Sequence, residues 1–230
     1  MIVFFDIDDT LLDHTSAERR AAGELARRLE PNERPEAFAR RWHEAAERHF
    51  ARFLAGELSF QDQRRERMRD LFGATVTDSE ADRLFDTYLA AYEASWSLFS
   101  DVLECLSGCA TMQLGIISNG DAGQQRRKLG VTGIARFFGR VLVSGECGLS
   151  KPDSMIFELA CSAVRSHPRD TVYVGDRLED DARAAQRAGM LGVWLDRTGT
   201  ADRSVTVPVI TSLLDLPKLL QSHGLAGPVS

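Results

Sequence analysis

The chain opens with Met1–His14, M-I-V-F-F-D-I-D-D-T-L-L-D-H, in which an apolar run meets a group of carboxylates. The run Ile2–Phe5 is typical of a buried β-strand. Three acids follow it almost at once: Asp6, Asp8 and Asp9. Like charges this close repel one another, and the end of a buried strand is a costly place for them. Their position indicates that the acids serve a function rather than the folding of the chain.

The second half of the chain alternates between two patterns. From residue 101 onward, short apolar runs each precede a helical pattern; the runs are M-Q-L-G-I-I, R-V-L-V, T-V-Y-V, G-V-W-L and V-P-V-I. Strands that alternate with helices pair in parallel through right-handed crossovers. We therefore predict an α/β fold, a Rossmann-like, doubly wound parallel sheet whose first strand is the N-terminal run.

Residues 15–100 have a different character, because they contain no convincing strand and are rich in Ala, Arg, Glu and Leu at helical spacing. Helices are predicted near residues 16–30, 35–54, 59–72 and 78–95. We predict an α/β core of residues 1–14 and 99–230, interrupted by a helical domain of residues 15–98. One of its helices carries arginines among acids, which is typical of a solvated face; they are Arg64, Arg65, Arg67 and Arg69.

The composition excludes several classes of function. The chain has 230 residues, 43% of them hydrophobic and 27% charged, and a net charge of -6, all ordinary for a globular protein. Its basic residues lie among acidic ones, so we expect it to bind neither nucleic acid nor membranes. No apolar run has the length of a membrane span, and no signal peptide is recognised. The four cysteines show no C-x-x-C spacing, so we expect reduced thiols in a cytoplasmic protein. We also expect a monomer or a homodimer.

Polar residues follow the apolar runs at the strand ends, where open α/β sheets bind their ligands. They are Ser118 and Asn119 after M-Q-L-G-I-I, Lys151 in the segment after R-V-L-V, and Asp176, Asp180 and Asp181 after T-V-Y-V. Carboxylates, a hydroxyl and a lysine at one edge of a sheet form an anion site around a hard cation, and Mg²⁺ prefers such oxygen ligands. One carboxylate in this site can attack phosphorus while another moves protons. These parts are the ones that phosphoryl transfer needs.

Four motifs carry a resemblance to a known family. D-I-D-D-T-L at residues 6–11 resembles the first motif, D-x-D-x-T, of the haloacid dehalogenase-like (HAD) superfamily. I-I-S-N-G at 116–120 resembles the second motif, Lys151-Pro152 the third, and G-D-R-L-E-D-D at 175–181 the fourth. The helical insert is similar to the family's C1 cap. S-N-G-D followed by Q-Q-R-R-K-L-G resembles the branch of N-acylneuraminate-9-phosphatase and pyrimidine 5′-nucleotidases.

The resemblance implies an Mg²⁺-dependent phosphomonoesterase that cleaves a small phosphorylated metabolite through an aspartyl-phosphate. Asp6 would be the nucleophile and Asp8 the general acid/base. The phosphoryl group would be bound by Thr10, Ser118, Asn119 and Lys151. Mg²⁺ would be held by Asp6, the backbone carbonyl of Asp8, Asp176 and Asp181. The sequence leaves open whether the substrate is a sugar phosphate, a nucleoside monophosphate or phosphoglycolate.

The fourth motif offers two candidates for its second acid, because family members place it four or five residues after the first. The stretch D-A-R-A-A-Q-R-A-G, from Asp181 to Gly189, matches the family's spacing to a closing glycine. We therefore favour Asp181 as the second acid and expect Asp180 to be a helix N-cap.

Three other functions are weighed against the phosphatase. A 2-haloacid dehalogenase also uses an aspartate nucleophile, but dehalogenases of this family lack the second aspartate, which this chain has as Asp8. A phosphomutase would use Asp8 to return the phosphoryl group to a reoriented intermediate. A non-enzymatic phosphoacceptor, as in receiver domains, would lack the helical insert and the aspartate two residues after the acceptor.

Overall fold

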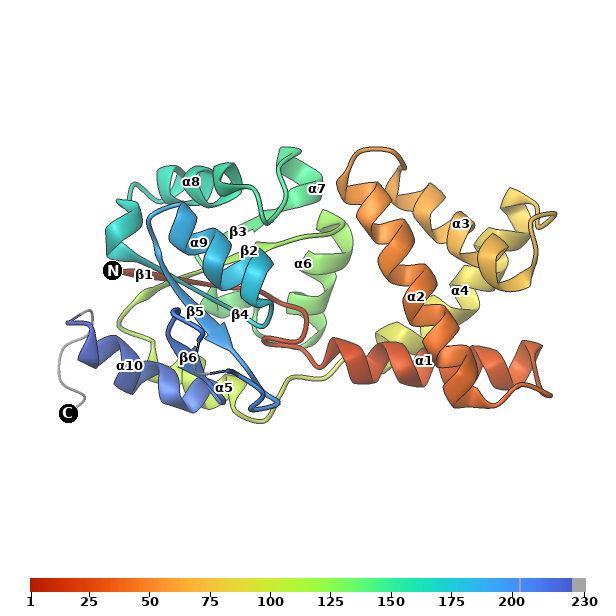
Figure 1. The fold of residues 1–230 in the computed structure, drawn as a ribbon, viewed down its shortest axis with the longest axis horizontal. Helices are drawn as coiled ribbons and strands as arrows, with labels where there is room; N and C mark the ends of the chain where they lie inside the picture. The colour runs from red at the N-terminus through yellow and green to blue at the C-terminus, as the bar shows by residue number, and fades with distance from the viewer. Residues whose placement is uncertain (203, 225–230) are drawn as a thin grey trace. The chain divides into compact units, whose positions relative to one another are not determined.

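The computed structural model describes residues 1–202 and 204–224 of the chain (Figure 1). Two compact units can be separated: Met1–Asp13 with the chain from Leu98 onward, and His14–Ser97. The first unit is built on a β-sheet, and the second is helical and inserted after the first strand. Within the described part of the chain, no helix is both long enough and apolar enough to cross a membrane.

The first unit contains a six-stranded sheet in which every neighbouring pair of strands is parallel. Its strands are β1 (Ile2–Phe5), β2 (Gln113–Ser118), β3 (Arg140–Val143), β4 (Thr171–Gly175), β5 (Leu191–Leu195) and β6 (Val209–Ile210). Their order in space is β3-β2-β1-β4-β5-β6. This is the order of a Rossmann-like, doubly wound sheet, so the predicted fold class is confirmed.

Helices cover both faces of the sheet, with α8 and α9 on one face and α5 and α10 on the other (Figure 1). The α-helices of this unit are α5 (Val102–Gly108), α6 (Ala122–Val131), α7 (Ser144–Cys147), α8 (Ser154–Ala163), α9 (Ala184–Arg187) and α10 (Leu216–Ser222). A π-helical turn, Leu178–Arg183, precedes α9, and 3₁₀ turns lie at Ala135–Phe137, Pro168–Asp170 and Leu213–Asp215. Phe4 of β1 and Tyr173 of β4 form a buried cluster with Phe157 of α8. The apolar strand residues therefore supply the core of this unit.

β1 lies where the winding of the sheet reverses. Ile2 pairs with Gln113 of β2 on one side and with Thr171 of β4 on the other. The N–H of Asp6, the first residue after β1, donates to the carbonyl oxygen of Val174 in β4 at 2.9 Å. Open α/β sheets bind ligands at such a switch point, beyond the carboxyl ends of the strands. The topology therefore brings together the acids that follow β1 and β4.

The helical unit has the helices predicted for it. They are α1 (His14–Leu29), α2 (Pro35–Leu54), α3 (Phe60–Phe72) and α4 (Asp78–Ala94). Their starts follow from local sequence: Pro35 occupies the first turn of α2, and the Ser59 hydroxyl accepts the Asp62 N–H at the start of α3. Thr77 and Glu80 form a capping box at the start of α4. These signals explain why the predicted and observed ranges agree closely.

The prediction that the arginines of α3 form a solvated face is wrong for Arg67. Arg65 and Arg69 remain partly exposed and pair with acids of α4. Arg67 is buried: its guanidinium lies over the Trp42 ring, 5.3 Å from the centroid, and donates to Gln63 at 2.8 Å. Burial lowers the pKa of Arg67, and the aromatic ring offsets part of that cost. The core of this unit therefore includes a charged side chain.

The π-helical turn packs against β5 at a glycine. A Cβ atom on Gly192 would overlap the backbone carbonyl oxygen of Ala182, and relief would require one backbone to move. Gly192→Ala should therefore lower the free energy of unfolding by about 1–3 kcal/mol, the usual cost of overpacking. Gly130→Ala in α6 is the matched control, because a Cβ there meets no atom within 4 Å. It should leave stability unchanged or raise it by up to about 1 kcal/mol. Urea titrations followed by circular dichroism measure both, and equal midpoints would contradict the close packing at Gly192.

Candidate active site

A tight turn follows β1 and carries the first group of acids. The N–H groups of Leu11 and Leu12 both donate to the Ile7 carbonyl oxygen at 2.9 Å, so the chain folds back at once. Asp9 has a φ of 55° in this turn, a left-handed conformation that Asp tolerates better than most residues. The turn leaves Asp6 buried at the edge of the sheet, with only 6% of its surface exposed.

Three carboxylates meet at this edge. Asp6 after β1, Asp176 after β4 and Asp181 of the π-helical turn each offer one oxygen, and these atoms lie within 4.8 Å of one another. Burial raises the pKa of Asp6 to about 6, although Lys151 acts in the opposite direction. Burial, followed by repulsion from Asp181 and Asp6, raises the pKa of Asp176 to about 8. The cluster therefore holds more negative charge than the protein alone stabilises.

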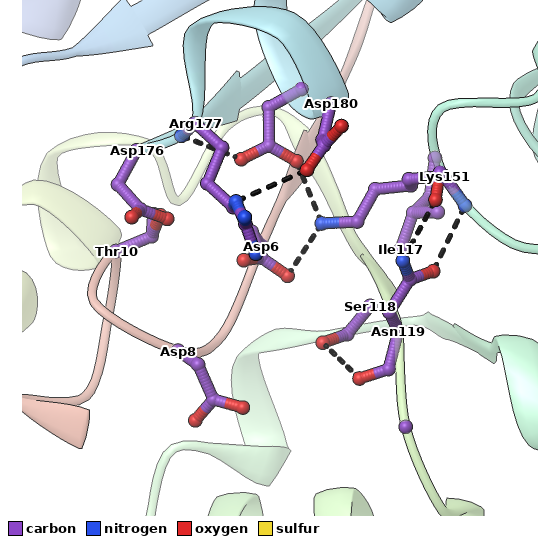
Figure 2. A network of polar contacts seen from close by, with 12 residues as sticks. Asp6, Asp8, Thr10, Ile117, Ser118, Asn119, Lys151, Asp176, Arg177 and Asp180 are labelled. Carbon is purple, nitrogen blue, oxygen red and sulfur yellow. Dashed lines mark hydrogen bonds and ion pairs between the residues drawn. The ribbon is translucent and has the colours of Figure 1, made fainter. Parts of the chain in front are cut away.

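Lys151 is a buried cation that faces this cluster (Figure 2). Its ammonium donates to Asp181 Oδ1 at 2.7 Å and lies 2.9 Å from Asp6 Oδ1. It also donates to the Tyr173 hydroxyl at 2.9 Å, and that hydroxyl donates to the Ile117 carbonyl oxygen at 2.9 Å. Burial acts to lower the pKa of Lys151, but the charges of Asp181 and Asp6 outweigh it and hold this pKa above its usual value. Lys151 therefore stays charged inside the site.

Asp181 reaches the cluster because of the backbone around it. The Arg177 N–H donates to Asp181 Oδ2 at 2.9 Å, and a Cβ on Gly175 would overlap the Asp181 carboxylate. Asp181 is fully buried, whereas Asp180 pairs with Arg177 Nε at 3.1 Å and does not belong to the cluster. The prediction that Asp180 is a helix N-cap is wrong, because the helical turn begins earlier, at Leu178.

The donor set of the cluster fits a Mg²⁺ ion. Asp6 Oδ1 is buried and makes no hydrogen bond to any described residue, although Lys151 lies at ion-pair distance. The carboxylate oxygens of Asp6, Asp176 and Asp181 are hard ligands of the type Mg²⁺ prefers. A doubly charged ion would also offset the repulsion that raises the pKa of Asp176. Coordination by the Asp8 backbone carbonyl stays a prediction.

The predicted phosphate-binding residues after β2 are held by a network of hydrogen bonds. The Asn119 side chain donates to the Lys151 carbonyl oxygen and accepts the Lys151 N–H, both at 2.9 Å (Figure 2). The buried Ser118 hydroxyl accepts a hydrogen bond from Gln125 at 2.9 Å. The side-chain amide of Asn119 therefore joins the second motif to the third. The predicted role of Asn119 in phosphate binding involves its backbone N–H, not this amide.

Asp8 and Thr10 make contacts that the motifs do not predict. The Asp8 carboxylate points away from Asp6 (Figure 2) and accepts from Lys128 Nζ at 2.6 and 2.8 Å. The Thr10 hydroxyl is buried and donates to Asp176 Oδ1 at 3.3 Å. Thr10 therefore supports a carboxylate of the cluster, and its role in phosphate binding stays a prediction.

Comparison with known proteins identifies the family of the chain. The model of the haloacid dehalogenase-like hydrolase family matches residues 1–189. The chain belongs to this family. Human N-acylneuraminate-9-phosphatase is 29% identical over 96% of this chain and 93% of its own length, and the glyceraldehyde 3-phosphate phosphatase of Methanopyrus kandleri is 32% identical over 85% and 83%. The crystal structure of a 2-haloacid dehalogenase from Pseudomonas syringae pv. Tomato DC3000 has a TM-score of 0.70 and 29% identity, covering 96% of this chain and 98% of that one.

The HAD motifs do not single out several residues that contact the site. Gln125 and Lys128 lie three residues apart on α6, within the stretch Q-Q-R-R-K-L-G that follows the second motif, and this spacing and the branch resemblance of the stretch are the signals that could have found them. Tyr173 has the pattern of an ordinary strand residue. Arg197, which donates to the Thr10 carbonyl oxygen at 2.7 Å, lies far along the chain. Only the fold brings Tyr173 to Asp181 and Arg197 to the Thr10 backbone.

The raised pKa of Asp176 predicts how the metal-free protein responds to pH. Between about pH 4 and pH 8 the folded chain holds a proton on Asp176 that the unfolded chain releases, so stability falls as pH rises through this window. Asp176→Asn removes this loss. In EDTA at pH 8, the melting temperature of the variant should be at least about 3 °C above that of wild type, the shift expected for about 1 kcal/mol. Near pH 4 the two melting temperatures should be equal.

Mg²⁺ provides the second readout of the same comparison. It should raise the melting temperature of wild type at pH 8 and leave that of Asp176→Asn unchanged, because the variant lacks one ligand. Asp180→Asn is the matched control and should behave as wild type in EDTA and in Mg²⁺, since Asp180 is not part of the cluster. A loss of the Mg²⁺ response in Asp180→Asn but not in Asp176→Asn would contradict the assignment.

Proposed function

We propose that the protein is an Mg²⁺-dependent phosphomonoesterase that cleaves a small phosphorylated metabolite through an aspartyl-phosphate. The observation that carries this proposal is a pair of acids two residues apart, Asp6 in the buried cluster and Asp8 beside it with 27% of its side chain exposed. One acid can attack phosphorus while the other moves protons. The phosphatases among the relatives support the same chemistry.

In the first step, Asp6 attacks the phosphorus in line with the bond to the leaving oxygen. A bond forms between phosphorus and the Asp6 carboxylate, the bond to the leaving group breaks, and Asp8 in its acid form gives its proton to the leaving oxygen. Lys151, at 2.9 Å from Asp6, stabilises the charge on the phosphoryl group. The Ser118 hydroxyl and the Asn119 N–H donate to its oxygens.

In the second step, water cleaves the aspartyl-phosphate. Asp8, now a carboxylate, takes a proton from the water whose oxygen attacks phosphorus. The bond between phosphorus and Asp6 breaks, inorganic phosphate leaves, and both acids return to their starting protonation states. The two steps use Asp8 in opposite senses, so one residue serves both.

Asp6, Asp176 and Asp181 would hold Mg²⁺, with the Asp8 backbone carbonyl as a further ligand. When bound, the ion would offset the negative charges of the nucleophile and of the phosphate. Thr10 keeps Asp176 in place through its hydroxyl. All four cysteines are free thiols, as the reducing cytoplasm in which we place the enzyme would require.

A 2-haloacid dehalogenase is the second candidate, because the neighbour from Pseudomonas syringae shares 29% of its residues with this chain. Displacement of halide needs an aspartate nucleophile but no proton for the leaving group. Asp8 would then have no proton to move, and Asp176 and Asp181 would have no metal to hold, although the fold gathers these two acids around Asp6. This argument ranks the phosphatase first.

A test of the nucleophile is Asp6→Asn, which replaces it by an isosteric amide. Phosphate release from a panel of sugar phosphates, nucleoside monophosphates and phosphoglycolate should require Mg²⁺ and stop in EDTA. On the best substrate, Asp6→Asn should lose at least about 100-fold in kcat, while Asp180→Asn keeps wild-type turnover. Halide release from 2-chloropropionate, with no phosphate release from any ester, would favour the dehalogenase.

Asp8→Asn separates the roles of the two acids. An alkyl phosphate leaves as a poor alkoxide, whereas p-nitrophenolate leaves without a proton, so the variant should lose far more rate on alkyl esters. Its aspartyl-phosphate should also break down slowly. Stopped-flow absorbance should therefore show a burst of about one p-nitrophenolate per active site, followed by a slow steady state. Equal losses on both ester types without a burst would show that Asp8 is not the acid/base.

A further inference from the structure

We propose that Lys128 is a positioning residue for Asp8, so that helix α6 sets the orientation of the proposed acid/base group. The inference rests on the proposed phosphatase function and adds a residue to its machinery. None of the four HAD motifs includes Lys128, and the two residues before it on α6, Arg126 and Arg127, are exposed. The contacts of its side chain carry the inference.

The contact between Lys128 and Asp8 fixes the carboxylate in two ways. Lys128 Nζ donates to Asp8 Oδ1 at 2.6 Å and to Oδ2 at 2.8 Å. A cation that bonds both oxygens restricts the rotation of the carboxylate as well as its position. The Lys128 side chain is only 3% exposed, whereas that of Asp8 is 27% exposed. Asp8 is thus held from its buried side while the rest of its surface stays open to reactants.

Gln125 holds the same carboxylate from one turn earlier on α6. Its Nε2 donates to Asp8 Oδ2 at 3.0 Å, to the Ser118 hydroxyl at 2.9 Å and to the Asn119 carbonyl oxygen at 3.2 Å. The same amide therefore contacts the proposed acid/base group and the proposed phosphate-binding segment. The helix starts from a firm cap, since Asp121 accepts the Gln124 N–H at 2.8 Å. Helix α6 thereby fixes the position of Asp8 relative to the proposed phosphate-binding segment.

A direct role of Lys128 in phosphate binding fits the contacts less well. An ammonium has three N–H donors, and two of those of Lys128 go to Asp8. Lys151, not Lys128, is the lysine beside the nucleophile.

The orientation that Lys128 imposes also keeps the Asp8 carboxylate turned away from Asp6 (Figure 2). Without it, the carboxylate would rotate among positions from which it reaches the leaving oxygen less often.

A double-mutant cycle tests the inference. Wild type, Asp8→Asn, Lys128→Met and the double variant are compared on p-nitrophenyl phosphate and on the best alkyl ester of the panel. Lys128→Met should lose about 10–100-fold in kcat on the alkyl ester, the range expected for a misplaced catalytic group, and much less on the aryl ester. In the Asp8→Asn background the same change should cost less than about twofold, because a residue that acts through Asp8 has nothing left to orient.

Conservative and matched variants complete the experiment. Lys128→Arg should restore much of the alkyl-ester rate, since a guanidinium can also bond both carboxylate oxygens. Arg126→Met is the control: it removes a cation from the same helix, one whose partner is the exposed Glu146, and should leave both rates unchanged. Lys128→Gln, with a polar head that can bond one Asp8 oxygen, should give an intermediate loss and serves if Lys128→Met does not fold.

The outcomes separate this inference from the proposed function. If wild type releases phosphate but Lys128→Met loses the same factor with and without Asp8, Lys128 does not act through Asp8 and the inference is overturned. A higher KM with unchanged kcat would assign Lys128 to substrate binding and also overturn it. If wild type releases no phosphate from any ester, the proposed function fails and this inference fails with it.

Discussion

The ion pairs of buried Lys151 with Asp6 and Asp181 are the contacts on which the site depends. Three carboxylates within 4.8 Å could not stay buried and charged without a cation among them. One lysine does not balance three acids, and the pKa values of Asp6 and Asp176 remain raised. The remaining imbalance is the charge that the proposed Mg²⁺ would offset. Keeping these acids buried thus lowers the stability of the metal-free protein, a cost that the proposed function would explain.

The backbone places the three acids of the cluster close together. The switch point beside β1 brings the ends of β1 and β4 together, which places Asp6 and Asp176. Asp181 comes from a different kind of element, a π-helical turn that can approach the sheet only because Gly175 and Gly192 have no side chains. Turns of this type occur often at functional sites. A single acid position therefore depends on two glycines from two strands.

Local patterns in the sequence predict the sheet, the helices of the inserted unit and the placement of Asp6 and Asp176, because strand ends in a parallel sheet share one edge. The resemblance to the family, through its spacing to a closing glycine, favours Asp181 over Asp180, and Asp181 is the acid that lies in the cluster. The prediction of an N-cap at Asp180 is wrong, because the sequence does not distinguish acids in the first turn of an α-helix from acids in a π-helical turn. Lys128 and Arg67 could not be placed, since their burial depends on side chains from distant segments. Tertiary packing decides such residues.

The central position of β1 has a consequence for the making of the protein. This strand is synthesised before both of its partners, which begin only at Gln113 and Thr171. The helical unit, His14–Ser97, is contiguous and emerges from the ribosome before either partner exists. Throughout that time Ile2–Phe5 is an apolar segment with unpaired backbone groups, the kind that joins other chains. Charges that flank an apolar strand hinder its joining other chains, and Asp6, Asp8 and Asp9 have this position. Asp6, the acid proposed to attack phosphorus in the folded enzyme, is thus also one of the charges that oppose aggregation of this strand before its partners exist.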